Sequence, residues 1–240
     1  ALHAYVGLNL PVPTPIQQCA RVGVRWDRLA GTQLQLCAPS SHFVGYDMQS
    51  VRRQLVHEVM NCPSDIILLD LGRAQDGISL DLFLEADVAI TMSRPEPVAM
   101  EQAYAFIRAA LFRHLVHGNS PAAQTVREVL TSPKGEAMPT FRSIIELLHR
   151  DAPNDCDDVK EALADFVPGV ILNGCASRAD REMLRGMVDG MHRRWSIDAI
   201  PLGALDFDDV ALQSSKWRRP LLTTYPGAAI SKGIEEVGSA

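Results

Sequence analysis

Short aliphatic runs alternate along this chain with longer stretches whose apolar residues have helical spacing. The most continuous run covers residues 65–71, where aliphatic residues lead to a carboxylate, Asp70, just before Gly72. An apolar run of this length between polar residues predicts a strand buried on both faces, as in a parallel α/β sheet. Asp70 would then lie at the carboxyl end of its strand, where open α/β sheets bind ligands. On this tract alone, an Asp that simply begins a loop is the commoner alternative.

The remaining pattern predicts an alternation of further strands and helices. Strands are expected at residues 33–37, 87–92, 169–173 and 199–205. Helices are expected at residues 48–61, 79–86, 98–117, 121–130, 141–150, 155–166, 178–194 and 210–216, with Ser120 as one N-cap and residues 206–209 as another. Because strands and helices alternate, the pattern predicts βαβ crossovers. We therefore expect an α/β fold with a doubly wound, mostly parallel sheet, since the strands are too few for an eight-stranded barrel.

Composition narrows the class of protein. With 240 residues and 47% apolar content, the chain can bury one sizeable core, so we expect a single domain over residues 1–240. The net charge of −6 and the absence of a basic block longer than residues 216–219 argue against a specific nucleic-acid partner. Five scattered cysteines suggest neither zinc nor a disulfide framework, and they fit a reducing cytosol. No apolar stretch is long enough to span a bilayer, so a soluble, cytoplasmic protein is expected.

An acidic cluster near the start of the helix at residues 155–166 is the one candidate for calcium. It lacks the glycine and the terminal glutamate of a calcium loop. A helix start tolerates negative charge, because the helix dipole is positive there. A capped, solvated helix start is therefore the expected reading.

Several segments, taken in order, resemble the MinD/ParA family of deviant P-loop ATPases. Within that family they are most similar to the MinD-like regulators of flagellar number and placement, the FlhG branch. The segments that carry the resemblance are residues 65–72, 82–87, 94–97, 103–110, 170–173, 203–210 and 218–222. The resemblance implies a P-loop NTPase fold, with ATP and Mg²⁺ as cofactors.

The resemblance also implies roles at the carboxyl end of the strand predicted at residues 65–71. Asp70 would orient water bound to Mg²⁺ or the attacking water, and Gly72 and Ala74 would form the second switch. Relatives usually carry glycine where this chain has Ala74, preceded here by Arg73. Alanine can donate its amide to the γ-phosphate only if its backbone angles permit, so hydrolysis and binding without hydrolysis both stay open.

A second group of residues would recognise the base, again by resemblance. Asn173 would hydrogen-bond the adenine edge, and the backbone around Leu205, Asp206 and Phe207 would pack along the base. From the residues alone, Asn173 can equally cap the next helix. Phe207 is more often a core residue than a stacking platform.

The phosphate loop that resemblance to this family requires is missing from these residues. No segment fits G-x-x-x-x-G-K-S/T or the deviant form with an extra lysine. We therefore expect this loop, the first switch and the first strand to lie upstream of Ala1. In the family that strand is central, next to the one ending at Asp70, so the chain alone is expected to be poorly stable and inactive as an ATPase.

The function implied by resemblance is an ATP-dependent, dimerising switch that controls the placement or number of a flagellum or division apparatus. ATP would bridge a homodimer, which would engage regulatory proteins and a peripheral site at the inner face of the cell membrane. A non-hydrolysing protein-binding module is the alternative. A redox relative such as the nitrogenase iron protein ranks last, because no cysteine pair follows the relevant strands. Residues 230–237 are short, glycine-broken and acidic, so no membrane-targeting amphipathic helix is expected there.

Overall fold

The computed structural model describes residues 27–28, 35–36, 53, 56–72, 77–116, 121–131, 144–146, 149–150, 153 and 155–239. The chain divides into two compact units. The first unit consists of Ala1–Ala74 and Asp208–Lys232, and the second of Gln75–Phe207 and Gly233–Ala240. The single-domain organisation stays a prediction.

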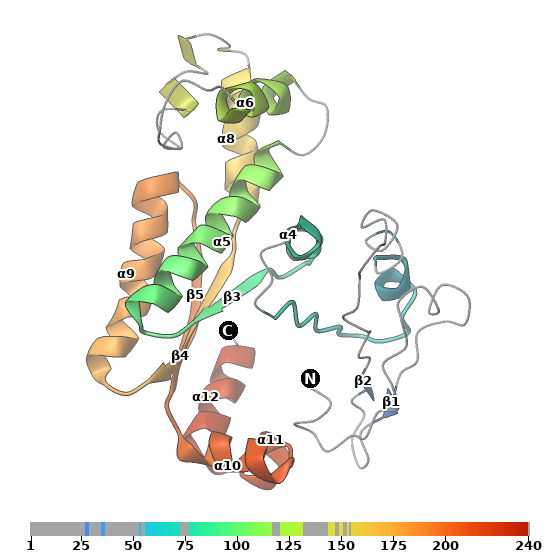
Figure 1. Cartoon of the computed structure of the whole chain (residues 1–240), viewed down its shortest axis with the longest axis vertical. Coiled ribbons are helices and arrows are strands. Elements are labelled where there is room, and N and C mark those ends of the chain that lie inside the picture. Colours follow the sequence, from blue (N-terminus) through green and yellow to red (C-terminus); the bar gives the residue numbers. More distant parts are fainter. Residues whose placement is uncertain are drawn as a thin grey trace. The chain divides into compact units, whose positions relative to one another are not determined.

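The second unit is built on a parallel sheet. Its described strands are β3 (Ile90–Ser93), β4 (Gly169–Cys175) and β5 (Ile200–Asp206), in the order β3-β4-β5 (Figure 1). Both neighbouring pairs run parallel, and each connection between them passes through helices. This confirms the prediction of a mixed α/β fold with an open parallel sheet.

Two long helices cover this sheet. Helix α5 (Pro97–Leu115) packs on β3, and α9 (Arg178–Trp195) packs on β4 and β5. The Tyr104 hydroxyl of α5 donates a hydrogen bond to the Met187 carbonyl of α9 over 3.1 Å. The Tyr104 ring also meets Trp195 edge to face, with the ring centroids 5.7 Å apart. The two helices therefore lie side by side over one face of the sheet, whereas Ile90, Met92 and Ile200 of the strands stay exposed.

A buried ion pair joins α4 (Gly77–Leu84) to α5. Asp81 is 5% exposed, and its carboxylate accepts two hydrogen bonds from the Arg113 guanidinium, one of them 2.9 Å long. The hydrogen bond to Asp81 raises the pKa of Arg113 above its usual value, and burial partly opposes it. Phe83 and Phe106 add an edge-to-face contact between the same two helices. Together these contacts fix α4 on α5.

Helices α6 (Pro121–Thr131) and α8 (Asp155–Asp165) pack on each other, and α8 also contacts α5. The His114 ring of α5 lies 2.9 Å from the Ala162 carbonyl of α8. Residues 144–146 and 149–150 are helical as well. All helices predicted between residues 98 and 166 are present where the structure describes them, while Ser120 lies outside the described residues.

The first unit contains a small antiparallel pair, β1 (Asp27–Arg28) and β2 (Gln35–Leu36). The strand predicted at residues 33–37 is thus described only over β2. Residues 56–60 are helical, as predicted. Helix α10 (Asp209–Trp217) packs with the short α11 (Leu221–Thr224).

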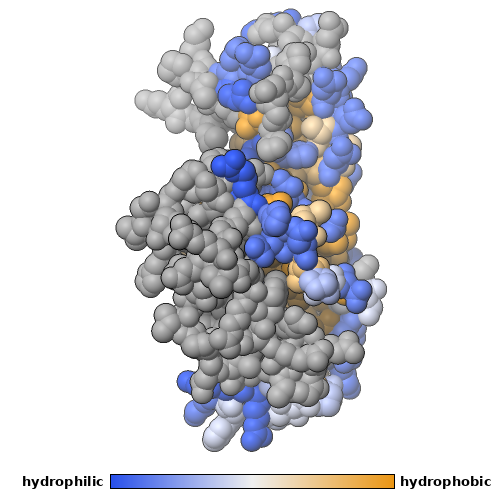
Figure 2. All heavy atoms as spheres, turned by 90° about the vertical axis from the view of Figure 1, so that its right-hand side faces the viewer, coloured by the Kyte–Doolittle hydropathy of each residue, from blue (hydrophilic) through white to orange (hydrophobic). Residues whose placement is uncertain are grey.

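The strand predicted at residues 65–71 is wrong. These residues form no strand, and Ile66 and Leu68 are 81% and 87% exposed. An interior strand is stabilised by backbone hydrogen bonds to neighbours on both sides, and none of the described strands pairs with this segment. Apolar atoms also reach the surface at other described positions, as orange spheres between blue ones show (Figure 2).

The C-terminal helix α12 (Ala229–Gly238) was not predicted as a helix. Its last turn packs on β5, because Val237 lies where a side chain on Gly203 would be. Gly233 allows the same close approach to Leu205. The glycine that interrupts the sequence pattern is therefore what lets this part of the helix lie close to the sheet.

Candidate functional site

The carboxyl ends of β3, β4 and β5 meet at one edge of the sheet. Ser93 pairs with Leu172, and Asn173 pairs with Leu205. Because the strands are parallel, the residues that follow them gather at this edge, where open α/β sheets bind ligands. The base-recognising residues expected from the sequence in β4 and β5 are therefore brought together within the second unit.

Asn173 keeps most of its hydrogen-bonding capacity. It is half-buried, and its amide nitrogen lies 3.6 Å from the Met92 thioether sulfur, which is a weak acceptor. Its register partner Leu205 is only 5% exposed. An amide that retains donors and an acceptor beside an apolar side chain is suited to the polar edge of a flat heterocycle.

Asp206, the last residue of β5, is held by an ion pair. Its two carboxylate oxygens accept hydrogen bonds from Arg181 in the first turns of α9, one of them 2.7 Å long. The hydrogen bond to Asp206 raises the pKa of Arg181. The carboxylate of Asp206 is thus engaged by Arg181.

Phe207 follows directly and lies on the surface. Its amide donates to the Cys175 carbonyl over 2.8 Å, which continues the β4–β5 pairing by one residue. The side chain is 53% exposed. The alternative that Phe207 is a core residue is therefore wrong, and its ring is exposed on the surface.

The start of α9 is organised by a reciprocal cap. The Ser177 hydroxyl accepts from the Asp180 amide at 3.2 Å, while the Asp180 carboxylate accepts from the amides of Ala176 and Ser177. This capping box begins the helix immediately after β4. Asn173 is therefore not the cap of this helix, which removes the alternative left open by the sequence.

Cys175 lies buried beneath this edge, with 2% exposure. Burial raises the pKa of its thiol, and the nearby carboxylates of Asp180 and Asp206 raise it further against the opposing effect of Arg181. A thiol in this environment stays protonated and is a poor nucleophile. It contributes to packing, not to reaction chemistry.

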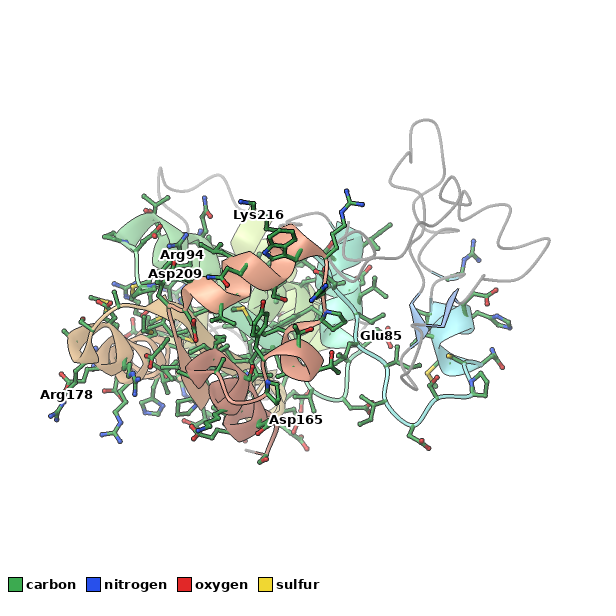
Figure 3. The ribbon with its side chains drawn as sticks, turned by 90° about the horizontal axis from the view of Figure 1, so that it is seen from below. Glu85, Arg94, Asp165, Arg178, Asp209 and Lys216 are labelled. Atoms are coloured by element: carbon green, nitrogen blue, oxygen red, sulfur yellow. The ribbon has the colours of Figure 1, made fainter. Side chains whose placement is uncertain are left out.

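Arg94 and Glu96 follow β3 and lie at the carboxyl end of that strand. Their side chains are joined by an ion pair of 3.1 Å, and both are mostly exposed. Gly174 has a positive φ of 80°, and a side chain placed there would lie 3.8 Å from Arg94 Nε. The guanidinium of Arg94, which is labelled in Figure 3, therefore lies close to the turn that follows Asn173.

Asp70 and Gly72 belong to the first unit and are described on their own. Asp70 is exposed, and its carboxylate accepts a hydrogen bond of 3.0 Å from the Gly72 amide. Gly72 has φ of 65°, a left-handed conformation that favours glycine. This is a local turn that holds the carboxylate at the surface. Arg73 and Ala74 lie outside the described residues.

The described part of the chain contains no group of three or more His, Cys, Asp or Glu side chains arranged to hold a metal ion. Magnesium in nucleotide sites is commonly held by one or two carboxylates together with phosphates and water, so the proposed role of Asp70 does not require such a group. Among the described helices, none has an apolar stretch of the length that would cross a bilayer.

No protein-family profile matches the sequence, and no curated protein sequence matches it significantly. The resemblance to the MinD/ParA family therefore stays a prediction.

The sequence analysis missed two ion pairs of this edge, Arg181–Asp206 and Arg94–Glu96. Arg181 and Asp206 are far apart in the chain, and only the crossover from β4 through α9 to β5 brings them together. Arg94 and Glu96 are near in sequence, and the flanking prolines could have indicated a rigid turn.

Proposed function

We propose that this chain acts as an ATP-dependent, dimerising switch of the MinD/FlhG type, with its base site at the carboxyl ends of β4 and β5. The observation that supports this most directly is the register of β4 and β5, which sets Asn173 opposite Leu205 and brings Phe207 next to them. A polar amide, a buried aliphatic side chain and an exposed ring at the carboxyl edge of a parallel sheet suit a purine base.

The residues present fit an adenine nucleotide at the base end. Asn173 can donate to and accept from the adenine edge, because its weak contact with Met92 satisfies it poorly. Phe207 can cover one face of the base, and the Arg181 ion pair holds Asp206 so that its backbone keeps a fixed path. These side chains bind and orient the base and take no part in phosphate chemistry.

By the resemblance alone, Asp70 of the first unit would hold Mg²⁺ or its waters. Asp70 is exposed, and the Gly72 amide holds one of its carboxylate oxygens. When bound, Mg²⁺ would neutralise charge on the phosphates of ATP. Gly72 has a left-handed conformation, which glycine adopts without a steric penalty, and this suits a turn that changes conformation in a switch.

In the proposed cycle, ATP bridges two copies and hydrolysis separates them again. The paired state would bind regulatory proteins and locate a flagellum or division apparatus, in the cytoplasm or at the inner face of the cell membrane. A switch of this kind works through differential binding of partners to the ATP-bound and the ATP-free states.

Nucleoside titration followed by NMR tests the base site in this chain directly. Adenosine is expected to shift the amide signals of Asn173 and Phe207, and guanosine is not. Asn173→Ala should weaken adenosine binding about fivefold, since it removes a hydrogen-bonding group worth roughly 1 kcal/mol. Asn61→Ala, at an exposed asparagine in the first unit, is the matched control. Equal shifts with guanosine, or equal loss in both variants, would rule out an adenine site at Asn173.

A further inference from the structure

A thiol and an imidazole meet at the start of α8 in the second unit. Cys156 in the first turn of α8 is 1% exposed, and its Sγ lies 3.4 Å from Nε2 of His149. The neutral ring accepts the thiol proton in the tautomer that leaves Nε2 unprotonated. His149 itself is exposed. The buried thiol is therefore in contact with a base that reaches solvent.

Two further charged side chains lie beside this pair. Lys160 follows one turn later in α8, and its Nζ lies 2.9 Å from the exposed carboxylate of Asp157. The hydrogen bond with Asp157 raises the pKa of Lys160, and the nearby Cys156 contributes to the same shift. Asp158 is exposed as well. Because Lys160 offsets the charge of Asp157, the base beside the thiol and not a net positive field distinguishes this site.

The other described cysteines have different neighbours. Cys175 is also buried, but burial and then two nearby carboxylates raise the pKa of its thiol. Cys62 is half-buried, and its Sγ lies 3.4 Å from the Ser64 hydroxyl, which is not a base at neutral pH. Among the described cysteines, Cys156 is the one that contacts an imidazole. The chain therefore contains its own comparison for the effect of a neighbouring base.

We propose that Cys156 is a site of oxidation by hydrogen peroxide, with His149 as the base that takes the thiol proton. A base within hydrogen-bonding reach is what activates a cysteine as a nucleophile. Burial determines the class of reagent, because a peroxide molecule is little larger than water, whereas bulky disulfides are excluded. Access is given at the start of the helix, where helix ends fray. The proposal uses no residue of the base site, so it is independent of the ATP-dependent function.

The oxidation needs no reagent besides the peroxide. Nε2 of His149 takes the thiol proton, and the sulfur attacks one peroxide oxygen while the O–O bond breaks. The sulfur is oxidised to a sulfenic acid and the peroxide is reduced. The leaving hydroxide takes the proton from His149 and departs as water. One thiol and one hydrogen peroxide thus give one sulfenic acid and one water.

Mapping the oxidised cysteines by mass spectrometry tests this assignment. The reduced full chain is treated with hydrogen peroxide, quenched with catalase, unfolded in urea with dimedone to capture sulfenic acids, and digested with trypsin. Cys62, Cys156 and Cys175 lie on separate tryptic peptides, residues 54–73, 151–160 and 161–178. Cys156 should be labelled about tenfold faster than the other two, because a free thiol is only a few per cent thiolate at pH 7.

His149→Ala distinguishes a base from a shield. Loss of the base should slow the labelling of Cys156 about tenfold, and imidazole added to the solution should restore part of the rate. His192→Ala is the matched control, because His192 is an exposed histidine on α9 whose ring is also hydrogen-bonded, to Asp198. This control should keep the original rate. Cys156→Ser gives the background labelling of the peptide 151–160.

Four results would overturn the proposal. The first is labelling of Cys156 no faster than that of Cys62 and Cys175. The second is faster labelling in His149→Ala, because the ring would then only shield the thiol. The third is slower labelling in His149→Ala that imidazole leaves unchanged, which would indicate altered packing. The fourth is an equal loss of rate in His192→Ala.

Discussion

Strand β4 and residues 65–71 are nearly the same kind of sequence with opposite environments. Each is a short aliphatic run that leads to a polar side chain, Asn173 in one and Asp70 in the other. In β4, Leu172 is fully buried between β3 and β5, whereas in the other segment Leu68 is 87% exposed and no described strand pairs with it. An aliphatic run therefore specifies a preference for a buried strand, and neighbouring strands decide whether one forms.

The largest expected difference comes from making the same substitution in both segments. Leu172→Ala removes a side chain with no exposed area and should lower the free energy of unfolding by about 2–5 kcal/mol. Leu68→Ala should change it by less than about 0.5 kcal/mol, because that side chain is already in water. Urea denaturation followed by circular dichroism measures both. Similar losses at the two positions would mean that residues 65–71 are buried in solution.

The next test concerns the ion pair between Asp81 of α4 and Arg113 of α5, the first buried contact that follows residues 65–71 in the chain. Arg113→Met keeps the aliphatic stem but leaves the buried Asp81 carboxylate without its guanidinium. We expect a loss of about 2 kcal/mol, below the roughly 3–5 kcal/mol of fully buried pairs because the Arg113 side chain is 37% exposed. Arg185→Met on the exposed side of α9 is the control. Hydrogen exchange of residues 66–71 should not change, and faster exchange there would show that α4 supports that segment.

At alkaline pH, the cysteine in β4 and the cysteine near residues 65–71 should be tested for their effect on the free energy of unfolding. Burial raises the pKa of Cys175, so as the pH rises above about 9 the unfolded chain loses this proton before the folded chain does. Stability from this group is complete below that pH and falls as the pH rises further. Urea denaturation across this range should show a shallower slope for Cys175→Ser. Cys62→Ser, at a cysteine close to residues 65–71, is measured alongside as the control for a cysteine-to-serine change.

The smallest expected effect is a stabilisation. Ser196 ends α9 with φ of 55°, and glycine adopts this conformation without a steric penalty. Ser196→Gly should raise the free energy of unfolding by about 0.5 kcal/mol. Native-state hydrogen exchange should show added protection in α9 and β4 only. Added protection in residues 66–71 would contradict the distinction between the two regions.

The elements predicted correctly are those in which local and long-range requirements agree. In α9, the helical spacing, the Ser177 and Asp180 cap and the packing of Met187 all favour the same helix. Residues 65–71 were predicted wrongly because an aliphatic run in the sequence does not show whether neighbouring strands are present to pair with it. Helix α12 was missed because Gly233 reads as a helix breaker, although it lies against Leu205.

The candidate site could be predicted only in part for the same reason. The polar ends of β4 and β5 are visible in the sequence, and parallel pairing then brings Asn173 and Leu205 together. The ion pair between Arg181 and Asp206 depends on the length and path of the crossover, which the sequence pattern does not specify. The sequence did not show whether Asn173 caps α9. In the structure Ser177 is the N-cap of this helix.

One carboxylate starts two helices in the first unit. Asp208 accepts from the Val210 amide of α10 over 2.9 Å with one oxygen, and from the Ile230 amide of α12 over 3.4 Å with the other. The free amides at the start of each helix thus share a single acceptor. As a consequence, loss of the Asp208 carboxylate would remove a hydrogen bond from the start of both helices at once. The stability of the two helix starts is therefore coupled through this one side chain.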